Sequence, residues 1–196
     1  MGQYERLSAQ DSSFILWERR ETPMHVGAVA ILEAGPLGSA DGGIDAAAIT
    51  RHVESRLHLL PRYRQRLAFT PVEGHPVWID DAHFDLAYHV RRTALPRPGT
   101  DAELKALVAR ILSQRLDRAK PLWEMWIVEG LEGGRFALVT KVHHCMVDGV
   151  SGMNLITLLM STSAEEPPVA APAWSPAPEP TAFDLLWSET ARRAST

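Results

Sequence analysis

The segment RFALVTKVHH, residues 135–144, decides the fold. It is nearly apolar over most of its length, which is typical of a strand in the middle of a sheet. A second strand-like segment, residues 123–129, precedes it, and the residues LEGG at positions 131–134 separate the two. A glycine-bearing connection of this length predicts a β-hairpin. We therefore expect an antiparallel pair whose second strand lies centrally and ends in two histidines.

The two histidines are the first candidates for chemistry. Successive side chains of a strand point to opposite faces, so His143 and His144 are not expected to face one cavity. The residues CMVDGVSG, 145–152, form a glycine-bearing turn, and the apolar run 153–160 is suited to a buried helix. Strand, turn and helix together place His144 and Asp148 near one end of the sheet. A structural histidine beside a core is the alternative interpretation.

Helix and strand signals alternate along the rest of the chain, which predicts a mixed α/β fold without an internal repeat. Residues 8–20 predict a first helix, and residues 24–32 predict a strand. Asp45 is a suitable N-cap for the next helix, with Ile44 and Ile49 as a hydrophobic staple.

A third helix is predicted after residue 100. Thr100 and Glu103 have the spacing of a capping box. Apolar residues then recur at helical spacing and indicate one buried face: Leu104, Leu107, Val108, Ile111 and Leu112.

Length and composition bound the class of protein. The chain has 196 residues, of which 45% are hydrophobic and 22% charged, so one full domain with a core is expected. A net charge of −4 does not favour nucleic acid as a partner. The single cysteine, Cys145, excludes an intrachain disulfide and fits a reducing cytoplasm. The chain has neither a secretory signal pattern nor an apolar run of about 18 residues, so any membrane contact is expected to be peripheral.

Proline marks a change of organisation near the end of the chain. Six of the 14 prolines lie between residues 165 and 180, interleaved with alanine, which is typical of an extended, semi-rigid linker. A short amphipathic pattern follows it. We predict a domain over residues 1–163, a Pro/Ala-rich linker over 164–181 that carries the chain away from the core, and the start of a truncated second region over 182–196.

Spacing argues against three other chemistries. Gly152 comes one position too early after Ser151 for a nucleophile elbow. The histidines lack the His-Glu-x-x-His spacing of zinc peptidases, so no metal is expected. A nucleophilic Cys145 would need a nearby base, and on extended backbone His144 points the other way, which favours a buried structural thiol.

Residues 143–149, HHCMVDG, match the HHxxxDG motif of the superfamily that contains chloramphenicol acetyltransferase, carnitine acyltransferases and peptide-synthetase condensation domains. Further segments resemble one branch, the bacterial wax ester synthase/diacylglycerol acyltransferase family. These segments are LSAQD at 7–11 with Phe14, PMHVG at 23–27, and PLWE at 121–124. The resemblance covers about residues 7–160. It implies a two-layer α/β half-domain of the chloramphenicol acetyltransferase type, with a mixed sheet and flanking helices.

The resemblance also implies an activity. Such enzymes transfer a fatty acyl group from acyl-CoA, the co-substrate, to diacylglycerol or a long-chain alcohol, without another cofactor. Their second histidine is the general base, which places that role on His144, and the ordinary histidine pKa of about 6.5 suits it. The motif aspartate, here Asp148, is understood to hold the loop through an ion pair with an arginine. Gly149 allows the turn a conformation that a Cβ forbids, and His143 orients the loop.

Substrate-binding residues are harder to assign. Arg62, Arg64 and Arg66 alternate within PRYRQRL, and in a strand they would line one face. Such a row could bind CoA phosphates or anionic lipid headgroups, whereas a solvated face paired with carboxylates is the alternative. Trp123 has the same two interpretations, as part of the scaffold or of a substrate pocket.

Family members run to roughly twice this length, so the resemblance implies that a C-terminal half-domain, absent here, completes the active-site tunnel. A cytoplasmic location is expected, with peripheral contact at the inner membrane face or lipid bodies as an option. Two alternatives stay open. One is a condensation or polyketide-associated acyltransferase that uses carrier-protein thioesters, against which PMHVG and PLWE argue. The other is a non-catalytic half-domain that binds lipid or regulates a partner.

Overall fold

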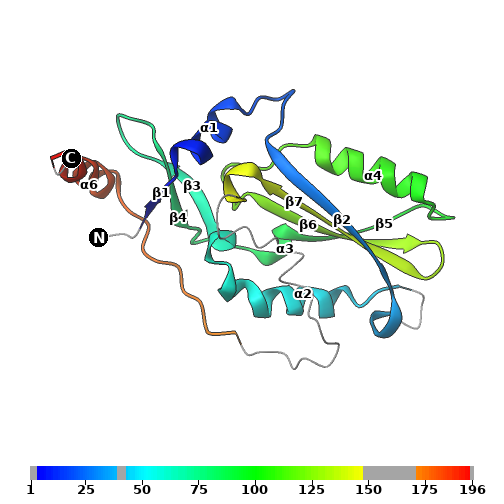
Figure 1. The fold of residues 1–196 in the computed structure, drawn as a ribbon. Coiled ribbons are helices and arrows are strands. Elements are labelled where there is room, and N and C mark those ends of the chain that lie inside the picture. Colours follow the sequence, from blue (N-terminus) through cyan, green and yellow to red (C-terminus); the bar gives the residue numbers. More distant parts are fainter. Residues whose placement is uncertain (1–3, 39–42, 148–170, 195–196) are drawn as a thin grey trace.

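The computed structural model describes residues 4–38, 43–147 and 171–194, which form two β-sheets with helices around them (Figure 1). The strands are β1 Glu5–Arg6, β2 His25–Glu33, β3 Gln65–Phe69, β4 Pro76–Asp80, β5 Val90–Ala94, β6 Trp123–Leu131 and β7 Arg135–His143. The α-helices are α1 Ala9–Trp17, α2 Ala46–Arg56, α3 Leu86–His89, α4 Asp101–Ser113 and α6 Ala182–Ala194. Short 3₁₀ helices are η1 Gly35–Leu37, η2 Leu57–Leu59, η3 Pro61–Arg64 and η4 His144–Met146.

The larger sheet has four strands in the order β2-β7-β6-β5. β7 is antiparallel to both of its neighbours, whereas β5 is parallel to β6, so the sheet is mixed. The predicted hairpin and the central position of β7 are confirmed. Gly133 and Gly134 in the turn have φ angles of 78° and 69°, which favour glycine. The register places His25 of β2 opposite His143, so the PMHVG segment lies beside the histidines.

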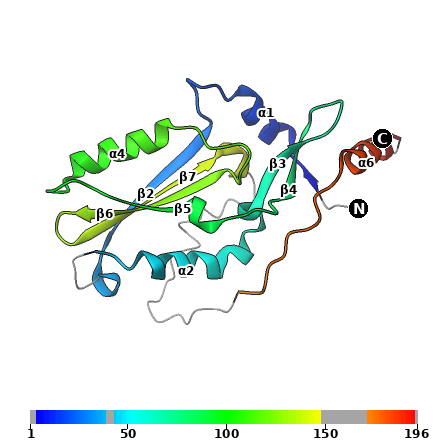
Figure 2. The same cartoon turned by 180° about the vertical axis from the view of Figure 1, so that it is seen from behind.

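Helices cover both faces of this sheet. On one face Trp123 and Leu138 pack in a cluster with Val53 of α2. On the other face Val139 packs in a cluster with Ile111 of α4. Figure 2 shows α2 and α4 on opposite sides of the strands. The predicted mixed α/β class with flanking helices is confirmed. One helix lies on each face of this sheet, because β6 and β7 carry buried apolar residues on both faces.

Two helices begin at the predicted caps. The side chain of Asp45 accepts the Ala48 N–H at 2.9 Å at the start of α2. At the start of α4, Thr100 and Glu103 form both halves of the capping box. These side chains satisfy N–H groups that the first helical turn leaves without a partner.

The first helix is shorter than its predicted range of residues 8–20. Ser8 caps it by accepting the Asp11 N–H, and α1 ends at Trp17. Glu18 follows with extended backbone angles, φ −61° and ψ 123°, and its side chain is buried. The helix ends where this carboxylate turns inward, to partners that the amphipathic pattern does not reveal.

The smaller sheet has the order β1-β4-β3, and α6 packs on it. Leu185 of α6 is buried in a cluster with Val77 and Ile79 of β4. Glu189 of α6 forms an ion pair with Arg6. The amphipathic pattern after the prolines is therefore a helix, and this helix packs on the preceding domain.

The described part of the predicted linker, residues 171–180, has neither helix nor strand, but it lies against the domain. The Ala177 N–H donates to Asp80 at 2.9 Å, and Glu179 forms an ion pair with Arg66 at 2.6 Å. The expectation of a spacer that carries the chain away from the core does not hold for these residues. Among the described helices, none combines the length and the apolar character needed to cross a bilayer.

Candidate active site

The two histidines separate at the end of β7. His143 is 1% exposed. His144, the first residue of η4, is exposed, and its ring stacks on Phe14 of α1 with ring centroids 4.1 Å apart. The His144 N–H donates to the Met24 carbonyl oxygen at 2.8 Å, which fixes its backbone beside β2. As predicted, the two rings do not face one cavity.

The buried ring of His143 has a hydrogen bond at one nitrogen and a carboxylate near the other. Its Nδ1 accepts the Cys145 N–H at 3.2 Å and lies 3.0 Å from the Cys145 Sγ. Its Nε2 lies 3.7 Å from a carboxylate oxygen of Glu18. Burial lowers the pKa of His143 to about 4, so the ring is neutral at pH 7. Because Nδ1 acts as an acceptor, we assign the proton to Nε2.

The distance between Cys145 and His143 would suit a catalytic cysteine–histidine pair, but the pKa of the thiol does not. Burial raises the pKa of the Cys145 thiol, whereas a nucleophilic cysteine needs a lowered one. Cys145 also packs in a cluster with Ile15 and Leu122. The structure therefore agrees with a structural thiol, although its contact is His143 and not its sequence neighbour His144.

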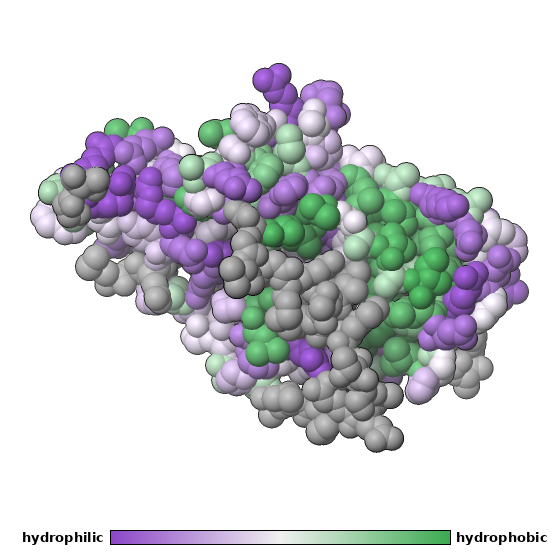
Figure 3. All heavy atoms as spheres, in the orientation of Figure 1, coloured by the Kyte–Doolittle hydropathy of each residue, from purple (hydrophilic) through white to green (hydrophobic). Residues whose placement is uncertain are grey.

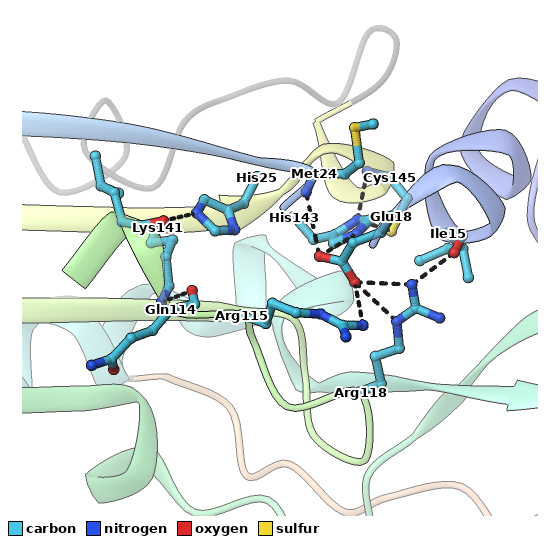
Figure 4. Close-up of polar contacts among 11 residues, drawn as sticks. Ile15, Glu18, Met24, His25, Gln114, Arg115, Arg118, Lys141, His143 and Cys145 are labelled. Atoms are coloured by element: carbon cyan, nitrogen blue, oxygen red, sulfur yellow. Dashed lines mark hydrogen bonds and ion pairs between the residues drawn. The ribbon is translucent and has the colours of Figure 1, made fainter. Parts of the chain in front are cut away.

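Glu18 is a buried residue of this region that sequence reasoning missed. Its carboxylate accepts hydrogen bonds from Arg118 at 2.9 and 3.1 Å, from Arg115 at 3.1 Å and from the Met24 N–H at 3.3 Å (Figure 4). Burial by itself raises the pKa of Glu18, but the hydrogen bonds from Arg118 and Met24 outweigh it and the pKa lies below its ordinary value. Glu18 is therefore an ionised carboxylate next to the neutral His143.

Lys141 of β7, two residues before His143, is a second buried charge. Its Nζ donates to the carbonyl oxygen of Gln114 at 3.0 Å (Figure 4). It also donates to the carbonyl oxygen of Ile111 at 3.1 Å and lies 3.3 Å from Glu124. It thus caps the C-terminal end of α4 from inside the sheet. Burial lowers the pKa of Lys141. This ammonium group links α4 to the strand that carries the motif.

The predicted row of arginines does not form. Arg62 and Arg64 lie in η3, and only Arg66 lies in a strand, so the three side chains share no strand face. Arg62 pairs with Glu5 at 2.7 Å. Arg64 is buried with its guanidinium over the Trp174 ring at 4.9 Å. The three arginines therefore lie in different environments and do not form one anion-binding row.

Of these three arginines, Arg62 lines a cavity next to the motif turn, and Arg6 lines the same cavity. This cavity has a volume of about 620 Å³, and its lining includes Cys145, Met146 and Trp78 besides Arg62. Trp123, in contrast, is fully buried, and its Nε1 donates to the Tyr63 carbonyl oxygen at 2.8 Å. The structure thus places Trp123 in the scaffold.

The remaining motif residues, Asp148 and Gly149, lie outside the described residues, as do Ser151 and the apolar run 153–160. Within the described ranges, no group of three or more His, Cys, Asp or Glu side chains could hold a metal ion.

Comparison with known proteins assigns the family. Residues 7–195 match the model of the wax ester synthase/diacylglycerol acyltransferase catalytic domain. The chain belongs to this family. A probable diacylglycerol O-acyltransferase of Mycobacterium tuberculosis, tgs3, is 41% identical over 182 residues, which are 92% of this chain and 65% of the relative.

Solved structures agree with this family assignment. The wax ester synthase/diacylglycerol acyltransferase of Marinobacter aquaeolei VT8 matches 85% of this chain with a TM-score of 0.71 and 36% identity. The starter condensation domain of rhizomide synthetase matches 80% with a TM-score of 0.57, but at 13% identity it shows the fold alone. The chain spans only part of its relatives, 65% of tgs3 and 39% of the Marinobacter chain.

Proposed function

We propose that the chain belongs to an acyl-CoA-dependent O-acyltransferase that transfers a fatty acyl group to diacylglycerol or a long-chain alcohol, with His144 as general base. The observation that carries the proposal is the contrast between the two histidines. His143 is buried and neutral, while His144 has an exposed ring on a backbone fixed by Met24. Family membership supports the reaction class, since matched relatives carry the names of diacylglycerol O-acyltransferase and wax ester synthase.

The reaction needs one proton carrier. His144 takes the hydroxyl proton of the acceptor as its oxygen attacks the thioester carbonyl carbon, which becomes a tetrahedral oxyanion. When this intermediate collapses, the C–S bond breaks and the departing CoA thiolate takes the proton from His144. The products are an ester and free CoA, without an acyl-enzyme. A positioned base contributes roughly 10²–10⁴-fold, and holding both substrates and stabilising the oxyanion must supply the rest.

We propose further that a second half-domain forms the opposite wall of the site. His144 is exposed, and β2 beside it exposes Val29 and Ile31 on one face and Val26 on the other. Figure 3 shows hydrophobic surface over this part of the molecule. Exposed apolar patches of this kind favour a docked partner, and an open site does not exclude water. The isolated chain of 196 residues is therefore expected to show little turnover, and robust activity of the pure monomer would contradict this part of the proposal.

The test of His144 uses the complete enzyme that contains this chain. We expect His144→Ala to lower the release of free CoA from palmitoyl-CoA, with a long-chain alcohol or diacylglycerol as acceptor, by at least about 10²-fold, because the hydroxyl loses its base. A thiol reagent measures the CoA released. His83→Ala, at an exposed histidine before α3, is the matched control. Equal turnover by the His144 variant would remove His144 from the mechanism.

The identity of the acyl donor distinguishes the proposed reaction from the condensation-type alternative. Acyl-CoA and an acyl-carrier protein with the same acyl chain are supplied to the same enzyme in parallel. We expect turnover with acyl-CoA. Turnover with the carrier protein alone would favour the condensation-type reaction. Peripheral contact with a membrane or lipid body stays a prediction.

A further inference from the structure

We propose that Glu18 is a positioning residue for the histidine pair: it holds the tautomer of His143 and, through Met24, the backbone of His144. The proposal rests on the proposed role of His144 and extends it to a residue outside the HHxxxDG motif.

The two carboxylate oxygens of Glu18 have different partners. Oε2 accepts the hydrogen bonds from Arg115 and Arg118, which come from the connection between α4 and β6. Oε1 accepts the Met24 N–H and lies 3.7 Å from the Nε2 of His143 (Figure 4). An ion pair that served only to fasten α1 to this connection would need Oε2 alone. The second oxygen is directed at the segments that carry the histidines.

One effect of Glu18 acts through the ring of His143. The Nε2–Oε1 distance of 3.7 Å exceeds a normal hydrogen bond, so the interaction is electrostatic. An anion beside Nε2 favours the tautomer with its proton on Nε2, which leaves Nδ1 free to accept the Cys145 N–H. The opposite tautomer would leave that N–H unpaired inside the protein and would weaken η4 at its first turn.

The other effect acts through the backbone. Glu18 accepts the Met24 N–H, and the Met24 carbonyl accepts the His144 N–H. Glu18 also donates its own N–H to the Phe14 carbonyl oxygen at 3.1 Å, and the Phe14 ring stacks on His144. The end of α1 therefore fixes the base in two ways, by its backbone and by the packing of its ring. A shift of Glu18 would move both.

The first experiment observes the tautomer directly. The chain is labelled with ¹⁵N-histidine, and two-bond ¹H–¹⁵N correlations identify the protonated nitrogen of His143, assigned with His143→Asn. In the wild type we expect the proton on Nε2. In Glu18→Gln we expect a measurable population with the proton on Nδ1 and shifted ring signals of His144, and Glu18→Asp should recover most of the wild-type pattern because it keeps the charge.

The matched control is Glu179→Gln, which removes another carboxylate that is paired with an arginine, Arg66. It should leave the His143 signals unchanged. A folded Glu18→Gln with wild-type tautomer and His144 signals would overturn the proposal. If Glu18→Gln does not fold, the wild-type spectrum decides by itself: a wild-type His143 with its proton on Nδ1 overturns the proposal, because the anion beside Nε2 would then not set the tautomer.

The second experiment measures steady-state kinetics of the complete enzyme. For Glu18→Gln we expect kcat to fall about 10- to 100-fold with KM nearly unchanged, because a misplaced base affects the chemical step. If Glu18→Gln changed KM and left kcat at the wild-type value, the result would contradict a positioning role. If His144→Ala keeps full turnover, the proposed function fails, while the tautomer measurement still decides whether Glu18 acts on His143.

Discussion

At the scale of the residue, two adjacent imidazoles have different environments and therefore different properties. His143 is enclosed by α1, β2 and the turn, and its pKa falls to about 4 because burial disfavours the charged ring. His144 is one residue further on, where η4 begins, and it remains exposed. Period-two alternation predicted that the rings diverge. It did not predict that the anion beside His143 would be Glu18, 125 residues earlier in the chain.

The buried His143 makes a testable contribution to pH dependence. The unfolded ring has a pKa of about 6.5 and the folded ring about 4, so between these values the unfolded state binds more protons. The free energy of unfolding should therefore decrease as the pH falls from 6.5 to 4, by about 2–3 kcal/mol from this ring.

Urea denaturation across this pH range measures the effect. His143→Asn keeps an acceptor near the Cys145 N–H but removes the titrating ring. The variant should lose less stability than the wild type between pH 6.5 and 4. Parallel curves for the two proteins would contradict the burial of a neutral His143.

At the scale of the element, capping and turn signals located α2, α4 and the β6–β7 hairpin, since each depends on residues a few positions apart. The strand predicted through Arg62 and Arg64 is wrong. Pro61 occupies the first position of η3, where its fixed φ favours a helical turn, and β3 begins only at Gln65. The alternating arginines are compatible with a strand, but the proline restricts the backbone more strongly and favours the helical turn.

The turn before α4 depends on close contact between two backbones. Gly99 has a φ of 80°, and a Cβ there would lie 1.8 Å from the Gly130 carbonyl oxygen. Gly74 has a comparable φ of 63° but no atom near its Cβ position. Gly99→Ala should lower the free energy of unfolding by about 3 kcal/mol or more, through strain and clash together.

Gly74→Ala is the matched control, because it suffers only the cost of the left-handed conformation, about 1–2 kcal/mol. Both values come from urea denaturation. Equal losses in the two variants would show that the contact between Gly99 and Gly130 does not restrict this turn.

At the scale of the whole molecule, segments far apart in sequence complete each other's packing. The helix after the prolines contributes Leu185 to the core of the small sheet. The side chain of Lys141 supplies the C-terminal cap of α4, about 30 residues earlier. Glu18, at the end of α1, likewise accepts hydrogen bonds from Arg115 and Arg118, about 100 residues later in the chain.

Docking of α6 can be tested with two adjacent leucines. Leu185 is 5% exposed and Leu186 is 43% exposed. Leu185→Ala should lower the hydrogen-exchange protection of α6 about 30-fold, the equivalent of losing about 2 kcal/mol of packing. Leu186→Ala should leave this protection nearly unchanged. Wild-type protection in Leu185→Ala would show that α6 is not held by this contact.

The amino-acid sequence determined the mixed fold class, the capped helices, the hairpin and the divergence of the two histidines. Each of these follows from steric preferences and hydrogen bonds among near neighbours in the chain. Only the tertiary structure decided that Glu18 meets Arg115, Arg118 and His143, that the arginines separate, and that α6 packs on β4. The order of strands in the sheets brings these side chains together. A sequence pattern over a few neighbouring residues does not specify that order.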